Sequence, residues 1–179
     1  LVIMVASTSK ITFAGGGVSC LVASDNNISD IKKRLSYQSI SQDKMNQLRH
    51  LKFFNDINSI KVHMKKQAAI LKPKFDCVIN HLNSELAGKE IASWHEPNGG
   101  YFISLDVMPG CAKRVGQLCK EAGVVLTTIG ATFPYGKDPQ DSNIRIAPSF
   151  PTIDELSQAA TLLCICVQIA AIEQLTTNN

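Results

Sequence analysis

Residues 1–17 read LVIMVASTSKITFAGGG, and this stretch decides the fold class. Residues 1–6 form an unbroken apolar run, and a second mostly apolar run, VSCLVAS, occupies residues 18–24. Two such runs, separated by a polar and glycine-rich segment, predict two short buried strands joined by a loop. Strands of this kind are typical of a sheet covered on both faces, as in α/β proteins.

Lys10 lies in the predicted loop, directly after Ser7, Thr8 and Ser9. A lysine at the end of a core strand is expected to be partly desolvated, which frees its amine as a nucleophile. The hydroxyls of Ser7 and Ser9 can donate to a phosphate ester, and glycines at residues 15–17 allow close backbone approach. The alternative is a surface lysine in a polar loop, without a chemical role.

Helices are predicted to follow the second strand. Two short ones cover residues 29–37 and 41–54, with Ser41 as the N-cap of the second. A long helical pattern with one apolar stripe then covers residues 59–86. Pro73 lies inside this pattern and removes a backbone hydrogen bond, so we expect a bent helix that connects two domains.

The C-terminal half is predicted to form a small α/β domain that begins with a hairpin. Apolar segments at residues 91–95 and 101–106 flank PNGG at residues 97–100. Glycine supplies the positive φ that hairpin turns require. Apolar segments at residues 124–128 and 143–147 continue the alternation.

Two helices complete this predicted domain. The first covers residues 111–122 and is followed by Gly123, the residue type expected just past a helix end. The second covers residues 153–175. Thr152 and Glu155 have the spacing of a capping box at its start.

Arg145 is the second candidate for chemistry. It lies in NIRIA at residues 143–147, where strand alternation places Asn143, Arg145 and Ala147 on one face. A guanidinium binds a carboxylate through two parallel hydrogen bonds, and a strand holds it rigidly. The alternative is an exposed or ion-paired arginine at a sheet edge.

Composition excludes several classes of protein. The chain has 179 residues, of which 45% are hydrophobic and 18% charged, as expected of a globular protein. A net charge of +3 is too small to indicate a nucleic-acid partner, and the basic run at residues 32–34 is interpreted as a solvated helix face. The apolar stretch at residues 162–172 is shorter than the roughly 20 residues of a spanning helix, so we predict a core helix and no membrane partner.

The six cysteines include no CxxC pair and lie mostly among apolar neighbours. This favours buried, reduced thiols in a cytoplasmic protein. Cys77 and His81 would share one helix face, but two ligands without a second pair are a weak zinc signal. No metal site is predicted.

These motifs together resemble the class I and II aminotransferases of fold type I, and most closely their aspartate-aminotransferase-like branch. The resemblance covers nearly the whole chain and rests on the order of four motifs, which are STSK, ITFAGGGVS, PNGGYF and NIRIAPSFPT. It implies the C-terminal portion of a longer, pyridoxal-phosphate-dependent transferase. The opening residue, which is not methionine, and the apolar run at residues 1–6 agree with this expectation.

The resemblance implies three parts and four site residues. The end of a large domain covers residues 1–58, a connecting helix residues 59–88, and a small α/β domain residues 89–179. By this resemblance Lys10 binds pyridoxal 5'-phosphate and acts as general acid and base, Ser7 and Ser9 lie near the phosphate, and Arg145 binds the substrate α-carboxylate. Many relatives have a phosphate-binding arginine eight residues after the lysine, where this chain has Val18.

The implied function is amino-group transfer between an L-amino acid, with aspartate or glutamate as candidates, and a 2-oxo acid. The family works as a homodimer, and the partners of the cofactor ring precede the lysine, so the chain alone is not expected to be competent. One alternative is a regulatory protein that keeps this fold and cofactor as a sensor. Another is a small structural domain without chemistry, which would be favoured if Arg145 were buried in an ion pair and pointed away from Lys10.

Overall fold

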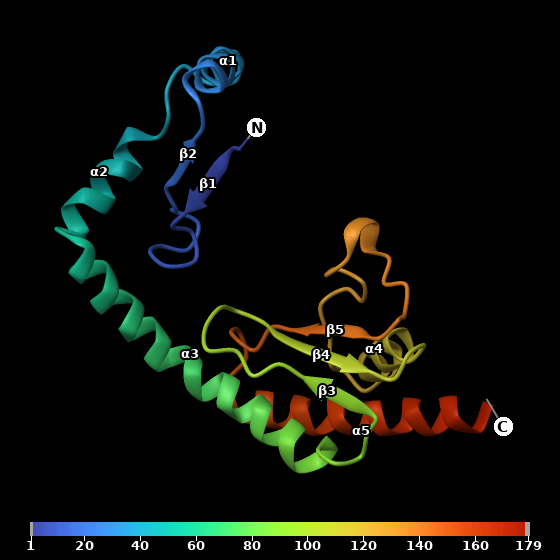
Figure 1. The fold of residues 1–179 in the computed structure, drawn as a ribbon. Coiled ribbons are helices and arrows are strands. Elements are labelled where there is room, and N and C mark those ends of the chain that lie inside the picture. The colour runs from blue at the N-terminus through green and yellow to red at the C-terminus, as the bar shows by residue number, and fades with distance from the viewer. Residues whose placement is uncertain (1, 178–179) are drawn as a thin grey trace. The chain divides into compact units, whose positions relative to one another are not determined.

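The computed structural model describes residues 2–177, which divide into two compact units, Leu1–Ala69 and Ile70–Asn179 (Figure 1). The division falls inside the long helix α3 (Ile57–Leu86), which contains Pro73 as predicted. The predicted domain limits at residues 58 and 88 stay predictions. Leu1, the first residue of the opening apolar run, lies outside the described residues.

The first unit contains a two-stranded antiparallel ribbon. Strands β1 (Met4–Ser7) and β2 (Ser19–Val22) pair with Ser7 opposite Ser19. The predicted strands exist, but the prediction that they are buried is wrong for the described residues, because every residue of both strands is exposed. A ribbon of two strands has no second layer of its own, and no further strand pairs with it in the described part of the chain.

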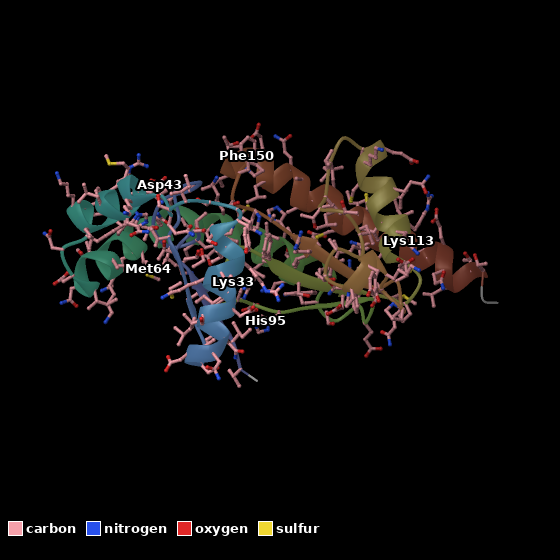
Figure 2. The ribbon with its side chains drawn as sticks, turned by 90° about the horizontal axis from the view of Figure 1, so that it is seen from above. Lys33, Asp43, Met64, His95, Lys113 and Phe150 are labelled. Atoms are coloured by element: carbon pink, nitrogen blue, oxygen red, sulfur yellow. The ribbon has the colours of Figure 1, made fainter. Side chains whose placement is uncertain are left out.

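Two short helices follow the ribbon. Helix α1 (Asp25–Ser36) begins four residues before the predicted start, and its basic run at residues 32–34 is exposed as expected. Helix α2 (Lys44–Phe53) is capped by Asp43, whose side chain accepts the N–H of Asn46 at 2.8 Å. The prediction of Ser41 as N-cap is wrong, since the nearer carboxylate takes that position. Figure 2 labels Asp43 and, on α1, Lys33.

The second unit is built on a three-stranded antiparallel sheet with the order β3-β4-β5. Its strands are β3 (Ala92–Trp94), β4 (Ile103–Val107) and β5 (Asn143–Ile146), and its other elements are α4 (Ala112–Glu121), the 3-10 turn η1 (Pro134–Gly136) and α5 (Ile153–Thr177). The PNGG hairpin is confirmed, and Gly100 has a φ of 91°. Residues 124–128 form no strand. Instead the Thr127 hydroxyl bonds to the Arg145 carbonyl at the edge of β5.

One face of this sheet packs on α3, α4 and α5, and the other face is polar. The cross-strand pairs Ile103–Ile146 and Leu105–Ile144 lie on the packed face, and all four residues are buried. Pairs of Ser104 with Arg145 and of Asp106 with Asn143 occupy the opposite face. The predicted alternation of β5 is therefore confirmed for Asn143 and Arg145.

Helix ends in the second unit follow the predicted signals. The N–H and hydroxyl of Thr152 donate to the Glu155 carboxylate at 2.8 and 2.9 Å, and the Glu155 N–H donates to the Thr152 hydroxyl at 3.3 Å. This is the predicted capping box. Gly123 has a φ of 88° just past α4, as expected of a helix C-terminus.

Helix α5 is long and apolar enough to span a membrane by length and composition. We interpret it as a core helix because eight of its residues are buried in the unit. Four of the six cysteines are buried as predicted, whereas Cys20 is exposed. Burial raises the pKa of Cys119 to about 12 and that of Cys164 to about 11, so both remain thiols at neutral pH.

Candidate active site

Lys10 lies in a tight turn that follows β1. The carbonyl of Thr8 accepts the N–H groups of Ile11 and Thr12, both at 2.9 Å, and so closes a turn around Lys10. The Lys10 side chain is exposed, which contradicts the prediction of partial desolvation within the described residues. The cause is the exposed ribbon, because all four residues of β1 are exposed and residues 2–177 place no second layer over it.

Ser7 and Ser9 lie beside Lys10 in the same segment, as the sequence predicted. Their hydroxyl oxygens are 2.7 Å apart, and the N–H of Ser9 donates to the Ser7 hydroxyl at 3.2 Å. Gly17 packs against this turn, since a Cβ at that position would lie 2.7 Å from Ser9 Cα. The glycine is required there because any side chain would push the loop away from Ser9.

This set of groups fits pyridoxal 5'-phosphate in two respects. An amine can react with the aldehyde, and two adjacent hydroxyls can donate to the phosphate ester. The position at which the family resemblance implies a phosphate-binding arginine is Val18, whose N–H donates to the Thr8 hydroxyl at 2.9 Å. The charge that balances the phosphate must therefore come from a residue other than Val18.

Arg145 belongs to the second unit and projects from the polar face of the sheet. Its guanidinium carbon lies 4.5 Å from the centre of the Phe102 ring, which is the geometry of a cation–π contact. Its Nε is buried without a hydrogen-bond partner, and no acidic side chain forms an ion pair with it among residues 2–177. The condition that would favour a purely structural domain is thus not met.

A hydrogen-bonded network fixes the strand that carries Arg145. The amide of Asn143 donates to Ser104 at 2.9 Å and to Asp106 at 2.7 Å, and its oxygen accepts from Thr132 at 2.7 Å. The Asn143 N–H donates to the Asp138 carboxylate at 2.8 Å. This bond is the main cause of the lowered pKa of Asp138. The network holds the start of β5 in place.

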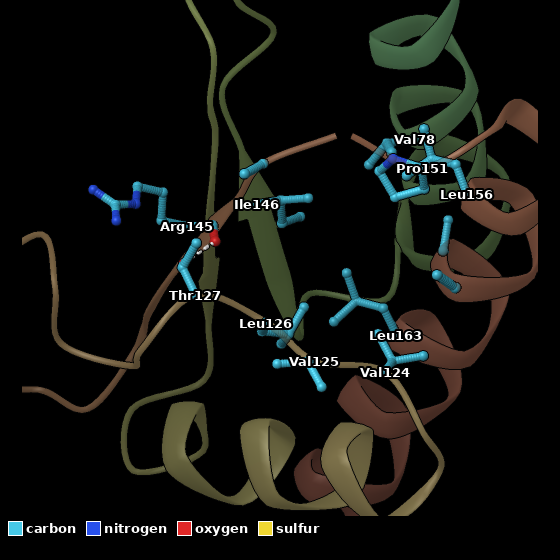
Figure 3. A pocket seen from close by; sticks show the side chains of 13 residues that line it. Val78, Val124, Val125, Leu126, Thr127, Arg145, Ile146, Pro151, Leu156 and Leu163 are labelled. Carbon is cyan, nitrogen blue, oxygen red and sulfur yellow. Dashed lines mark hydrogen bonds between the residues drawn. The ribbon is translucent and has the colours of Figure 1, made fainter. Parts of the chain in front are cut away.

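An apolar cavity of about 130 Å³ lies on the other side of β5 (Figure 3). Its walls include Leu126, Ile146, Leu156 and Leu163. The side chain of Arg145 points away from these residues (Figure 3). A carboxylate held by Arg145 would therefore lie on the polar face of the sheet and not in this cavity.

Two residues in contact with, or close to, the candidate residues were not predicted from the sequence, one in each unit. Phe102, the last residue of PNGGYF, stacks on Arg145, and an aromatic two residues after a hairpin glycine was the available signal. Thr12, two residues after Lys10, is 3% exposed and hydrogen-bonded to His50. No local pattern indicated this second contact, because 38 residues separate its partners.

Comparison with known proteins identifies the family. Residues 2–179 match the family model described as aspartate amino-transferase. The chain belongs to this family. A Mycolicibacterium smegmatis protein, named only provisionally as an aminotransferase, is 50% identical over 170 residues, which are 95% of this chain and 40% of that protein. The aspartate aminotransferase of Corynebacterium glutamicum is 46% identical over 167 residues, 93% of this chain and 39% of the enzyme.

Solved structures of the aspartate aminotransferase family agree with this assignment. The chain superposes on a Corynebacterium glutamicum aspartate transaminase with a TM-score of 0.90 and 45% identity, covering 95% of this chain and 40% of that structure. The expected fold class, the C-terminal portion of a fold-type-I transferase, is confirmed. The chain spans about 40% of the length of the relatives it matches.

Proposed function

We propose that this chain supplies the cofactor lysine and the carboxylate-binding arginine of a pyridoxal-phosphate-dependent aminotransferase. The observation that carries the proposal is the Lys10 turn, in which a lysine and two paired hydroxyls lie together in a chain of the aspartate aminotransferase family. The complete polypeptide that contains this chain, here called the intact protein, would hold the rest of the site.

Each named residue has a separate task in this proposal. Bound pyridoxal phosphate supplies the electron sink for the bond broken at the substrate Cα. Lys10 Nζ binds the cofactor and then moves a proton to and from the reacting carbons. Ser7 and Ser9 donate hydrogen bonds to the phosphate, while Arg145 fixes the substrate carboxylate so that the Cα–H bond is held in one orientation.

Aspartate and glutamate are the proposed amino donors, with a 2-oxo acid as acceptor. The support is the name of the 46% identical Corynebacterium glutamicum relative, an aspartate aminotransferase. Purified intact protein, loaded with pyridoxal phosphate, should form oxaloacetate from aspartate and 2-oxoglutarate in a coupled assay. Transfer from alanine or an aromatic amino acid at a higher kcat/KM would refute the donor assignment, while absence of transfer from every amino acid would favour a regulatory protein.

The assembly and location of the intact protein are also proposals. A homodimer in the cytoplasm is expected from the family resemblance. Sedimentation of the intact protein would test the dimer, and a monomer with full activity would refute it.

A further inference from the structure

The turn that carries Lys10 is fixed at both ends by part-buried polar contacts. At its first end, the Thr8 N–H donates to the Val18 carbonyl at 2.8 Å, and the Thr8 hydroxyl accepts the Val18 N–H at 2.9 Å. At its second end, the Thr12 N–H donates to the Thr8 carbonyl at 2.9 Å, and the Thr12 hydroxyl oxygen lies 3.0 Å from the same carbonyl. Lys10 lies midway between these two anchored residues.

Thr12 is held by two helices of the same unit. Its hydroxyl oxygen lies 2.9 Å from His50 Nε2 on α2. Its carbonyl accepts from Gln67 Nε2 on α3 at 3.0 Å, and His63 Nε2 lies 3.0 Å from the same oxygen. Thr12 is thus the residue through which α2 and α3 hold the turn that carries Lys10.

One proton position in this network follows from its partner. His50 Nδ1 lies 2.9 Å from the Asn46 carbonyl, which can only accept, so Nδ1 carries a proton. When Nε2 carries no proton, it accepts the single hydrogen of the Thr12 hydroxyl, which is then not available to the Thr8 carbonyl. The Gln67 amide nitrogen lies 2.7 Å from His63 Nε2 and 3.0 Å from the Thr12 carbonyl, to which it donates.

Aromatic rings shield the network from water. Phe13 packs edge-on against His50 with ring centres 5.0 Å apart, and Phe54, which is 7% exposed, lies 5.3 Å from the His63 ring. Hydrogen bonds are stronger in such surroundings, and a polar atom left unpaired is costly there. Loss of the Thr12 hydroxyl would therefore leave His50 Nε2 without its partner and loosen one end of the turn.

We propose that Thr12, which is hydrogen-bonded to His50 and Gln67, is a positioning residue that holds Lys10 for reaction with its cofactor and substrate. The inference rests on the proposed role of Lys10. Lysine has a long, flexible side chain, so the placement of its backbone decides how often Nζ reaches the reacting atom. Thr12 itself touches neither substrate nor cofactor in this account.

The test compares Thr12→Val, which keeps the shape and removes the hydroxyl, with Thr12→Ser, which restores the hydroxyl, in the intact protein. We expect Thr12→Val to lower kcat by about 10- to 100-fold, as a displacement of about 1 Å can do, with KM changed less than about threefold. The rate at which pyridoxal phosphate attaches to Lys10, measured by trapping with borohydride, should fall by a similar factor. Thr12→Ser should restore most of kcat and most of the labelling rate of Lys10.

Thr161→Val is the matched control, because it removes an exposed threonine hydroxyl from α5, and its activity should equal that of the unchanged protein. If Thr12→Val does not fold, Gln67→Leu removes a donor to the Thr12 carbonyl and should give the same separation of kcat from KM.

Three outcomes would overturn the inference. One is a folded Thr12→Val protein with unchanged kcat and labelling rate. Another is a Thr12→Val protein that is less stable but shows no separate fall in kcat, with a loss of stability that Thr12→Ser also shows. The third is that the protein without any substitution is never labelled at Lys10. Of the three outcomes, only this one would also refute the proposed function.

Discussion

Replacing Lys10 by alanine in the intact protein is expected to lower kcat for amino-group transfer by roughly 10³-fold or more. The change removes both the covalent attachment of the cofactor and the group that moves the substrate proton. Stability should change by less than about 0.5 kcal/mol, because the side chain is exposed. Steady-state kinetics and thermal unfolding measure the two effects separately.

Lys33→Ala is the control for this experiment, since Lys33 is also an exposed lysine of the first unit but lies on α1. It should leave kcat unchanged. Full activity in Lys10→Ala would show that another group performs the chemistry, and the account of the turn would then be wrong.

Replacing Arg145 by glutamine should raise KM for the amino acid by roughly 10- to 100-fold, the cost of hydrogen bonds to a charged partner. The guanidinium is stacked on Phe102, and in this proposal its terminal N–H groups bind the substrate carboxylate. Arg145→Lys should recover only part of the loss, because an ammonium cannot form the two parallel bonds.

Arg34→Gln is the control for the Arg145 series. Arg34 forms an exposed ion pair with Asp30 at 2.8 Å, and pairs of this kind contribute little to stability. Its kinetics should match those of the unchanged protein. An Arg145→Gln protein that folds normally and keeps its KM would exclude Arg145 from carboxylate binding.

The parts of the fold that the sequence predicted are those set by short-range rules. The PNGG hairpin, the capping box of Thr152 and Glu155, and the glycine after α4 each depend on residues within a few positions of one another. The alternation that placed Arg145 on the polar face of β5 is of the same kind.

The errors arose where distant residues decide the outcome. The apolar sequences of β1 and β2 predicted that both strands are buried. Burial depends on a second layer of structure, and no such layer covers these strands in the described part of the chain. Residues 124–128 have strand-forming composition, yet Thr127 reaches β5 through its hydroxyl and Val125 is 85% exposed. The hydrogen bond between His50 and Thr12 joins segments 38 residues apart, which no local pattern reveals.

The central claim is that Lys10 binds the cofactor. Borohydride reduction of the intact protein with bound pyridoxal phosphate, followed by peptide mass spectrometry, tests it most directly. We expect a phosphopyridoxyl label on the peptide that contains Lys10 and the loss of this label in Lys10→Ala. A folded protein with excess cofactor and no label on Lys10, or a label on a different lysine, would contradict the account.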